Sequence, residues 1–349
     1  MDTTRRQFMQ VLATGAAATA LTPVSTLAKA RSAEPANGRR RVIIDTDTAT
    51  DDAVAILLAM RAPEIKVEAI TIVVGNVAFE QEAQNALYTL QISGHAHQVP
   101  VFLGSSRPLL HAFHTDATYV HGKDGMSNTF FPEPEQKPEQ EWAIDAMIRL
   151  IETHPREITI VAIGALTNMA LLLLRKPSIA PLIQGITFMG GTYKFYGNVT
   201  PVATFNIWVD PEAASIVFHS GVPLTTVGFD VSVHSSVFTD ADYERVAKLG
   251  TPLSKFFIDI NKVRRVYCKE HQKMNGSNHP DAMATAIVID PTIGLEMLPR
   301  YCDIETQGQL TRGTMVIDEL GVYKQQPNVT VCASADEKKF KDMVFSALS

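Results

Sequence analysis

Four aspartates stand within eight residues near the start of the chain. Asp45 and Asp47 follow the short apolar segment 42–44, and Asp51 and Asp52 open a segment with helical periodicity. Alternate side chains of an extended strand share a face, so Asp45 and Asp47 lie together. No Lys or Arg stands among the four, so repulsion raises their pKa values unless a cation is bound. Ca²⁺ and Mg²⁺ prefer such oxygen ligands, and we predict a metal site here.

Other interpretations explain less of this cluster. Helix capping accounts for Asp51 but not for the pair at the strand end. An EF-hand is excluded, because Thr50 stands in place of its central glycine and Ile56 in place of its terminal glutamate. An Asp-x-Asp after a first strand is also typical of haloacid-dehalogenase-type phosphatases, which have Thr or Val where this chain has Ala49. A Mg²⁺-dependent phosphatase therefore stays open as an alternative.

Alternating strands and helices position the aspartates. Apolar strand patterns cover residues 42–44, 67–74, 99–103, 158–163, 186–189 and 224–227, and helical patterns cover 51–60, 80–92, 166–174, 211–219 and most of 239–270. This order predicts an α/β fold with a single open, mostly parallel sheet flanked by helices, followed by a C-terminal helical or mixed region. Such a sheet binds its ligand beyond the carboxyl ends of its strands. We expect one domain over 41–349, with 132–141 as a solvated loop.

The composition is that of a globular protein. Of the 349 residues, 46% are hydrophobic and 19% are charged, which excludes a disordered or coiled-coil chain. The formal net charge of −6 argues against binding to nucleic acid polymers or anionic membranes. Cys268, Cys302 and Cys332 are too few for a disulfide scaffold, although one disulfide between two of them stays open.

The first thirty residues predict an export signal. Arg5 and Arg6 precede a weakly apolar, Ala-rich run that is shorter than the roughly 20 residues needed to span a bilayer. We expect a twin-arginine signal peptide over 1–30, cleaved near Ala30, and a flexible lead-in over 31–40. The mature protein is then periplasmic or otherwise exported, without a stable membrane anchor.

The strand–DTDxxxDD–helix segment and five later segments resemble the inosine-uridine preferring nucleoside hydrolase family. In order along the chain, the later segments are VVGN (73–76), HGKDG (121–125), IGALTN (163–168), GNVTPVATFNIWVDPEAA (197–214) and HPDA (279–282). The similarity covers about residues 41–290. It implies a Ca²⁺-dependent hydrolase that cleaves the N-ribosidic bond of a nucleoside, or of a related N-riboside, to free base and ribose. It also allows a homo-oligomer, either a dimer or a tetramer.

The resemblance implies roles for the metal-binding and catalytic residues. Ca²⁺ is expected to be held by four groups: Asp47, Asp52, the backbone carbonyl of Ile163, and Asp281. Asp45 is expected to brace these ligands from behind. Asp47 is also expected to take the proton from the attacking water, with Asn76 near the reacting centre.

Further residues are expected to bind the substrate. The resemblance implies that Asp51 holds the ribose 2′-hydroxyl, and that Asn198 and Asn206 bind the other sugar hydroxyls. His121 is expected at the rim, in contact with the base. The transition state resembles an oxocarbenium ion, so the surrounding negative charge would stabilise it.

The sequence departs from the family pattern in three ways. The first motif has Thr48-Ala49 where the family has Pro-Gly. Thr204 replaces a ribose-binding glutamate, so a neutral hydrogen bond replaces a charge-assisted one. Pro280 stands where many members have a histidine that protonates the leaving base, and His279 is displaced by one residue. His279 is expected to act as this acid if a shift of the loop restores its position; otherwise another feature, such as aromatic stacking, must activate the leaving base. The departures at Thr204 and Pro280 leave a second hypothesis open: a non-catalytic or weakly active nucleoside-binding homologue.

Overall fold

The computed structural model describes residues 38–111 and 116–349. The expected signal peptide and residues 31–37 of the expected lead-in lie outside the described residues. The end of that lead-in belongs to the fold, because strand β1 already begins at Arg40. The Arg39 guanidinium donates hydrogen bonds of 2.7 and 3.1 Å to the Ile65 carbonyl.

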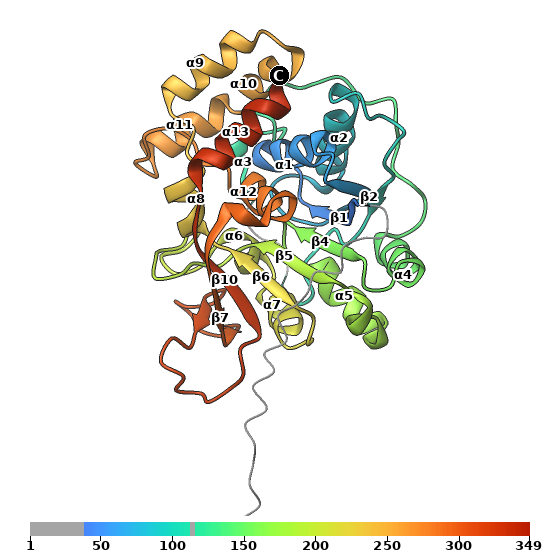
Figure 1. The fold of residues 1–349 in the computed structure, drawn as a ribbon, viewed down its shortest axis with the longest axis vertical. Coiled ribbons are helices and arrows are strands. Elements are labelled where there is room, and N and C mark those ends of the chain that lie inside the picture. Colours follow the sequence, from blue (N-terminus) through green and yellow to red (C-terminus); the bar gives the residue numbers. More distant parts are fainter. Residues whose placement is uncertain (1–37, 112–115) are drawn as a thin grey trace, which may run out of the picture. The chain divides into compact units, whose positions relative to one another are not determined.

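Eight strands form one open sheet in the order β3-β2-β1-β4-β5-β6-β10-β7 (Figure 1). Their bounds are β1 (Arg40–Thr46), β2 (Ile65–Ile72), β3 (Val101–Leu103), β4 (Ile158–Ala162), β5 (Gly185–Met189), β6 (Leu224–Val227), β7 (Gly294–Arg300) and β10 (Val329–Ala335). All neighbouring pairs are parallel except β7 and β10, which are antiparallel. The predicted open, mostly parallel sheet is confirmed.

Helices cover both faces of the sheet (Figure 1). One apolar core packs α1 (Thr50–Arg61), α2 (Phe79–Ile92), α8 (Phe229–Ser235), α9 (Asp240–Leu249), α10 (Pro252–Ile260), α12 (Pro280–Ile289) and α13 (Glu337–Leu348). The other packs α4 (Ala143–Thr153), α5 (Thr167–Arg175), η1 (Pro177–Leu182) and α7 (Pro211–Phe218). The neighbouring residues Ile43 and Ile44 of β1 belong to different cores, because strand side chains alternate between faces.

The remaining elements lie around this framework. They are α3 (Thr118–His121), α6 (Phe205–Val209), α11 (Lys262–Glu270), η2 (Pro291–Ile293), and the strands β8 (Cys302–Ile304) and β9 (Met315–Ile317), which pair into a separate small sheet. The predicted strands and helices are present, and 132–141 is a loop as expected. The sequence patterns did not place the helices α3, α4, α6, α8, α12 and α13, nor the individual strands of the C-terminal region, of which β7 and β10 belong to the main sheet. Helix α12 is buried along its whole length. It therefore has no polar face, and its sequence lacks the alternation of apolar and polar residues that indicates an amphipathic helix.

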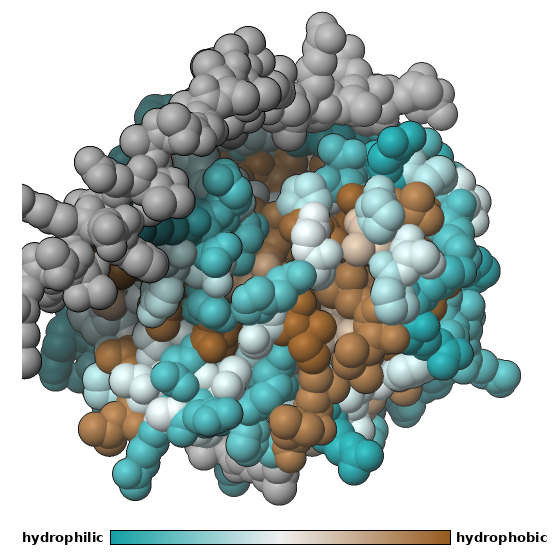
Figure 2. Space-filling view, turned by 90° about the horizontal axis from the view of Figure 1, so that it is seen from below, coloured by the Kyte–Doolittle hydropathy of each residue, from teal (hydrophilic) through white to brown (hydrophobic). Residues whose placement is uncertain are grey.

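Thirteen large apolar side chains are exposed among the described residues, and they are spread along the chain. Six of them lie from β7 to the start of β10: Leu295, Leu310, Val316, Leu320, Val322 and Tyr323. The view from below shows apolar and polar side chains interspersed on the surface (Figure 2). None of the described helices combines the length and the hydropathy needed to cross a membrane. Cys268, Cys302 and Cys332 are buried free thiols, so the disulfide left open above is not formed.

Asp210 joins three parts of the chain near the carboxyl ends of the strands. Its carboxylate accepts hydrogen bonds from the Ala213 amide (3.0 Å) at the start of α7 and from the Thr167 hydroxyl (2.7 Å) of α5. It also accepts one from the Leu109 amide (2.8 Å) in the loop after β3. This buried acceptor directly follows α6, the helix that carries Asn206.

We expect Asp210→Ala to lower the free energy of unfolding by about 2–4 kcal/mol, because three donors lose a buried acceptor. Asp336→Ala is the matched control, since Asp336 caps α13 through the Lys339 amide alone. That change should cost about 1 kcal/mol. Urea denaturation followed by circular dichroism measures both, and equal losses would contradict the joining role of Asp210.

Candidate active site

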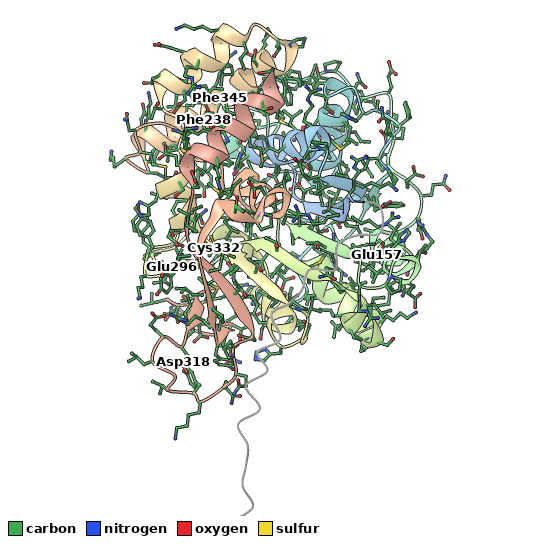
Figure 3. All side chains as sticks on the ribbon, viewed as in Figure 1. Glu157, Phe238, Glu296, Asp318, Cys332 and Phe345 are labelled. Atoms are coloured by element: carbon green, nitrogen blue, oxygen red, sulfur yellow. The ribbon has the colours of Figure 1, made fainter. Side chains whose placement is uncertain are left out.

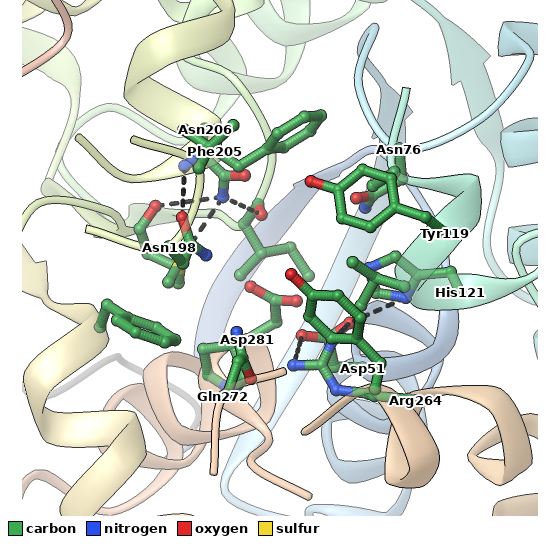
Figure 4. A pocket seen from close by; sticks show the side chains of 18 residues that line it. Asp51, Asn76, Tyr119, His121, Asn198, Phe205, Asn206, Arg264, Gln272 and Asp281 are labelled. Atoms are coloured by element: carbon green, nitrogen blue, oxygen red, sulfur yellow. Dashed lines mark hydrogen bonds and ion pairs between the residues drawn. The ribbon is translucent and has the colours of Figure 1, made fainter. Parts of the chain in front are cut away.

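A pocket opens at the carboxyl ends of the central strands (Figure 4). Its lining includes seven of the residues predicted from the sequence: Asp51, Asn76, His121, Ile163, Asn198, Asn206 and Asp281. They come from α1, the turn after β2, α3, the end of β4, the loop before α6, α6 itself, and α12. The topology therefore brings together segments that are far apart in the sequence.

Three carboxylates in this region are close enough to share one ion. Asp51, Asp52 and Asp281 each offer one oxygen, and these oxygens all lie within 4.8 Å of one another. Asp52 is fixed by hydrogen bonds from the Thr46 hydroxyl (2.7 Å) and the Ala49 amide (3.0 Å). The ligand set expected from the resemblance had Asp47 in place of Asp51, so the two sets share Asp52 and Asp281.

Asp47 is buried and has two unpartnered oxygens among the described residues. Two glycines make room for it. A Cβ on Gly75 would lie 1.8 Å from Asp47 Oδ2, and one on Gly164 would lie 3.0 Å from Oδ1. A buried carboxylate without donors is costly unless a cation satisfies it. The oxygen-only donor set of this cluster therefore fits a hard divalent cation such as Ca²⁺.

Asp45 is buried near the end of β1, and its expected bracing of the metal ligands stays a prediction. It does not line the pocket, and its Oδ1 accepts hydrogen bonds from the Asn168 amide (2.7 Å) and the Thr71 hydroxyl (2.5 Å). Burial raises the pKa of Asp45 to about 7, although both hydrogen bonds lower it. Asn168 also donates to the Ile72 carbonyl (3.0 Å) and so ties the end of β1 to β2.

The turn after β2 holds Asn76 against the cluster. The Asn76 amide donates to the Asp47 carbonyl (3.1 Å) and to Asp52 Oδ2 (3.3 Å). Glu82, a buried carboxyl of α2 that the sequence analysis missed, accepts a hydrogen bond from the Val77 amide (3.1 Å). Glu82 therefore fixes the turn that presents Asn76.

The carboxyl groups of the cluster differ in their ionisation. Burial, with the nearby Asp51 charge, raises the pKa of Asp52 to about 7. Burial also raises the pKa values of Asp47 and Asp281 well above the ordinary range. For Asp51, burial raises the pKa, but the Arg264 guanidinium and His121 outweigh it and the net pKa is lowered. A bound dication would favour ionisation of the other three.

Arg264 is a functional residue that the sequence analysis missed. It is buried in α11 and lines the pocket, where its Nη2 lies 2.9 Å from Asp51 Oδ2 and its Nη1 lies 3.2 Å from Asp51 Oδ1. Arg264 and Cys268 are the two buried residues of α11, and they are spaced i, i+4. A charged residue on the buried face of a helix is rare, and Arg264 could have been recognised from the sequence by its position on that face of α11.

The asparagines expected to bind the sugar line the pocket next to Ile163. The Asn206 amide donates to the carbonyls of Ile163 (2.6 Å) and Met189 (3.2 Å). Asn198 Oδ1 accepts a hydrogen bond from the Phe205 amide (2.8 Å). Thr204, also predicted to contact substrate, is not part of the pocket lining, because its buried hydroxyl accepts from the Gly191 amide (2.8 Å).

His279 points away from the pocket. Its ring lies 5.2 Å from each of the Phe238 and Phe257 rings. The Phe238 ring also lies 5.7 Å from the Phe345 ring, and Figure 3 labels these two residues near one another. Burial lowers the pKa of His279 to about 3, so its ring is neutral at pH 7. Pro280 takes the lining position instead. The one-residue displacement therefore places His279 in the core, where its position does not support the predicted acid role.

His121 lies on the pocket wall, as predicted. Its Nδ1 is 2.6 Å from the Thr50 hydroxyl and 3.7 Å from Asp51 Oδ1. Burial lowers its pKa to about 3, although Asp51 opposes this, so the ring is neutral at pH 7. Tyr119 and Tyr267 pack edge to face at 5.5 Å on the same wall and line the mouth of the pocket.

The raised pKa values predict how stability depends on pH without calcium. Between about pH 4 and 7 the folded cluster holds protons that the unfolded chain has lost, so the free energy of unfolding falls as the pH rises through this range. Asp52→Asn removes one titrating group, so the free energy of unfolding should decrease less steeply with pH in this variant. Urea denaturation in EDTA at several pH values measures it, and an unchanged slope in Asp52→Asn would contradict the assignment.

The chain resembles known proteins over most of its length. Residues 42–342 match the family model described as inosine-uridine preferring nucleoside hydrolase. An inosine-uridine preferring nucleoside hydrolase of Leishmania major is 39% identical over 313 residues, which are 88% of this chain and 97% of that protein. A pyrimidine-specific ribonucleoside hydrolase, RihA, of Salmonella typhimurium is 35% identical over 308 residues, with coverage of 88% and 97%.

Solved structures show the same fold. A purine-preferring ribonucleoside hydrolase from Gardnerella vaginalis superposes with a TM-score of 0.83 at 29% identity, covering 88% of this chain and 98% of that one. A plant nucleoside hydrolase, PpNRh1, superposes with a TM-score of 0.82 at 29% identity and the same coverage.

Proposed function

Because the chain belongs to the inosine-uridine preferring nucleoside hydrolase family and is a hydrolase acting on N-glycosyl compounds, we propose that it is a Ca²⁺-dependent nucleoside hydrolase. It would cleave the N-ribosidic bond of a nucleoside, or of a related N-riboside, to free base and ribose. The observation that carries the proposal is the buried acidic cluster beside the pocket, of which Asp51 and Asp281 line the pocket and Asp47 has two unpartnered oxygens.

We propose that four groups hold the ion: Asp47, Asp52, Asp281 and the Ile163 carbonyl. The Ile163 carbonyl accepts from Asn206 and keeps a second lone pair for the ion. When bound, Ca²⁺ would lower the pKa of a water molecule and so supply a nucleophile near neutral pH. With the ion bound, the Asp47 carboxylate would be ionised and could then receive the proton of the attacking water.

The other pocket residues would bind the sugar and stabilise charge. The same pocket is lined by Asp51, Asn198 and Asn206. The Asp51 carboxylate can accept hydrogen bonds from ribose hydroxyls, and the two asparagine amides can donate or accept them. As the bond from the anomeric carbon to the base nitrogen breaks, positive charge develops on the sugar. The fixed carboxylates stabilise this charge without reorganising.

The base would lie toward the mouth of the pocket, against Tyr119, Tyr267 and His121. The two tyrosine rings can stack on a planar base, and the neutral His121 can donate one hydrogen bond. The names of the relatives include purine-preferring and pyrimidine-specific enzymes, so the panel of substrates must contain both classes.

We predict that the wild-type protein with calcium releases free base and ribose from at least one nucleoside, and that Asp47→Ala lowers kcat at least a thousandfold, because the proton acceptor and a metal ligand are both lost. Asp342→Ala, which removes an exposed carboxylate of α13, is the control and should retain full activity. Base release is followed by chromatography.

Three outcomes would contradict this proposal. Asp47→Ala as active as wild type would remove the mechanism. Tight binding of an intact nucleoside without turnover would favour the binding-protein hypothesis. Phosphate release from phosphomonoesters, without base release, would favour the Mg²⁺-dependent phosphatase.

We also propose that the protein is exported through the twin-arginine pathway. The support is the Arg5-Arg6 pair before a weakly apolar run. Replacing both residues by lysine should keep the full-length precursor in the cytoplasm, whereas wild type is found shortened in the periplasmic fraction. Arg31→Lys, beyond the expected cleavage point, is the control. Unchanged fractionation of the twin-lysine variant would contradict this route.

A further inference from the structure

Arg264 brings a positive charge into the acidic cluster. Its guanidinium contacts both oxygens of Asp51, with Nη2 2.9 Å from Oδ2 and Nη1 3.2 Å from Oδ1 (Figure 4). Both side chains are buried, with 7% and 5% of their surfaces exposed. A two-point contact of this kind fixes the orientation of the carboxylate as well as its charge.

The guanidinium is also held from its other side. Arg264 Nε donates to the Asn278 carbonyl (3.0 Å), and Nη2 donates to Asn278 Oδ1 (3.2 Å). The Asn278 amide in turn donates to the Ser232 hydroxyl (2.9 Å) of α8. Arg264 is therefore anchored independently of Asp51, and it restricts where the Asp51 carboxylate can turn.

This anchoring bears on which carboxylates reach a metal ion. By distance, Asp51 belongs to the same group as Asp52 and Asp281. A dication bound to an Asp51 oxygen would however lie close to a fixed guanidinium, and two buried cations repel strongly. Paired carboxylate oxygens keep free lone pairs, so Asp51 can still accept a hydrogen bond from a neutral hydroxyl.

We propose that Arg264 withholds Asp51 from the metal ion and reserves its carboxylate for a substrate hydroxyl. Arg264 is thus a positioning residue that separates the metal-binding carboxylates from the sugar-binding one. The inference rests on the proposed function, in which a cation and a sugar bind side by side in this pocket. This role of Arg264 explains why Asp51 is not expected to bind the ion, although its carboxylate lies as close to Asp52 and Asp281 as a shared metal ion would require.

Removal of the guanidinium should therefore change metal binding itself. In Arg264→Met, Asp51 gains freedom to act as a further anionic ligand, and the nearby positive charge is lost. Both effects strengthen binding of a dication. In the double variant Arg264→Met with Asp51→Asn, the net charge of the pair stays zero, as in wild type.

The test is calorimetric titration of the calcium-depleted protein with Ca²⁺, without nucleoside. We expect Arg264→Met to bind calcium at least tenfold more tightly than wild type, and the double variant to bind within threefold of wild type. Arg265→Met is the matched control, since Arg265 pairs with Asp240 and lies over the Tyr243 ring, outside the pocket. Its affinity should equal that of wild type.

Two results would overturn the inference. Equal or weaker binding by Arg264→Met would show that Arg264 does not keep Asp51 from the ion. A double variant that binds at least tenfold more weakly than wild type would show that Asp51 is itself a ligand. The double variant leaves neither member of the Arg264–Asp51 pair as an unpaired buried charge, so it still tests whether Asp51 is a ligand if Arg264→Met fails to fold.

The same titration separates this inference from the proposed function. If wild type binds no calcium, the metal-dependent mechanism fails, and the inference fails with it. If wild type binds calcium and the double variant does not, only the role of Arg264 fails. Hydrolysis does not enter the measurement, so an inactive but calcium-binding chain would still give a decisive result.

Discussion

Repulsion among buried carboxylates at one end of the sheet is the constraint on which the site depends. Asp47, Asp52 and Asp281 are held where water is largely excluded, and burial raises the pKa of each. Such an arrangement is unfavourable for folding unless a cation or protons neutralise it. A bound cation offsets the unfavourable free energy of burying these charges. The same negative charge stabilises the positive charge that develops on the sugar, so the cation and the sugar are expected in one pocket.

Uncharged residues hold the carboxylates together in the fold. Glycines at positions 75 and 164 leave room for Asp47, and the amides of Asn76 and Asn168 bind the backbone and carboxylates around it. The parallel sheet brings these segments to one edge, because all of its central strands end there. The site therefore follows from the topology as much as from the aspartates.

The sequence predicted the parts of the site that depend on local pattern. The strand–DTDxxxDD–helix junction placed four carboxylates, and alternating strands and helices gave the sheet. The sequence did not predict where a side chain points when its direction is set by packing against distant parts of the chain. Thr204 and His279 turn into the protein, toward the Gly191 amide and the Phe238 ring. Arg264 pairs with Asp51, which is 213 residues away in the chain, and no local pattern encodes such a pair.

We propose that this cluster binds a cation beside the sugar, with different carboxylates binding each. A crystal structure of the protein with calcium and ribose would decide whether it does. We expect one ion coordinated by Asp47, Asp52, Asp281 and the Ile163 carbonyl, with Asp51 on a ribose hydroxyl. An empty cluster, or an ion bound elsewhere while ribose occupies the pocket, would contradict it.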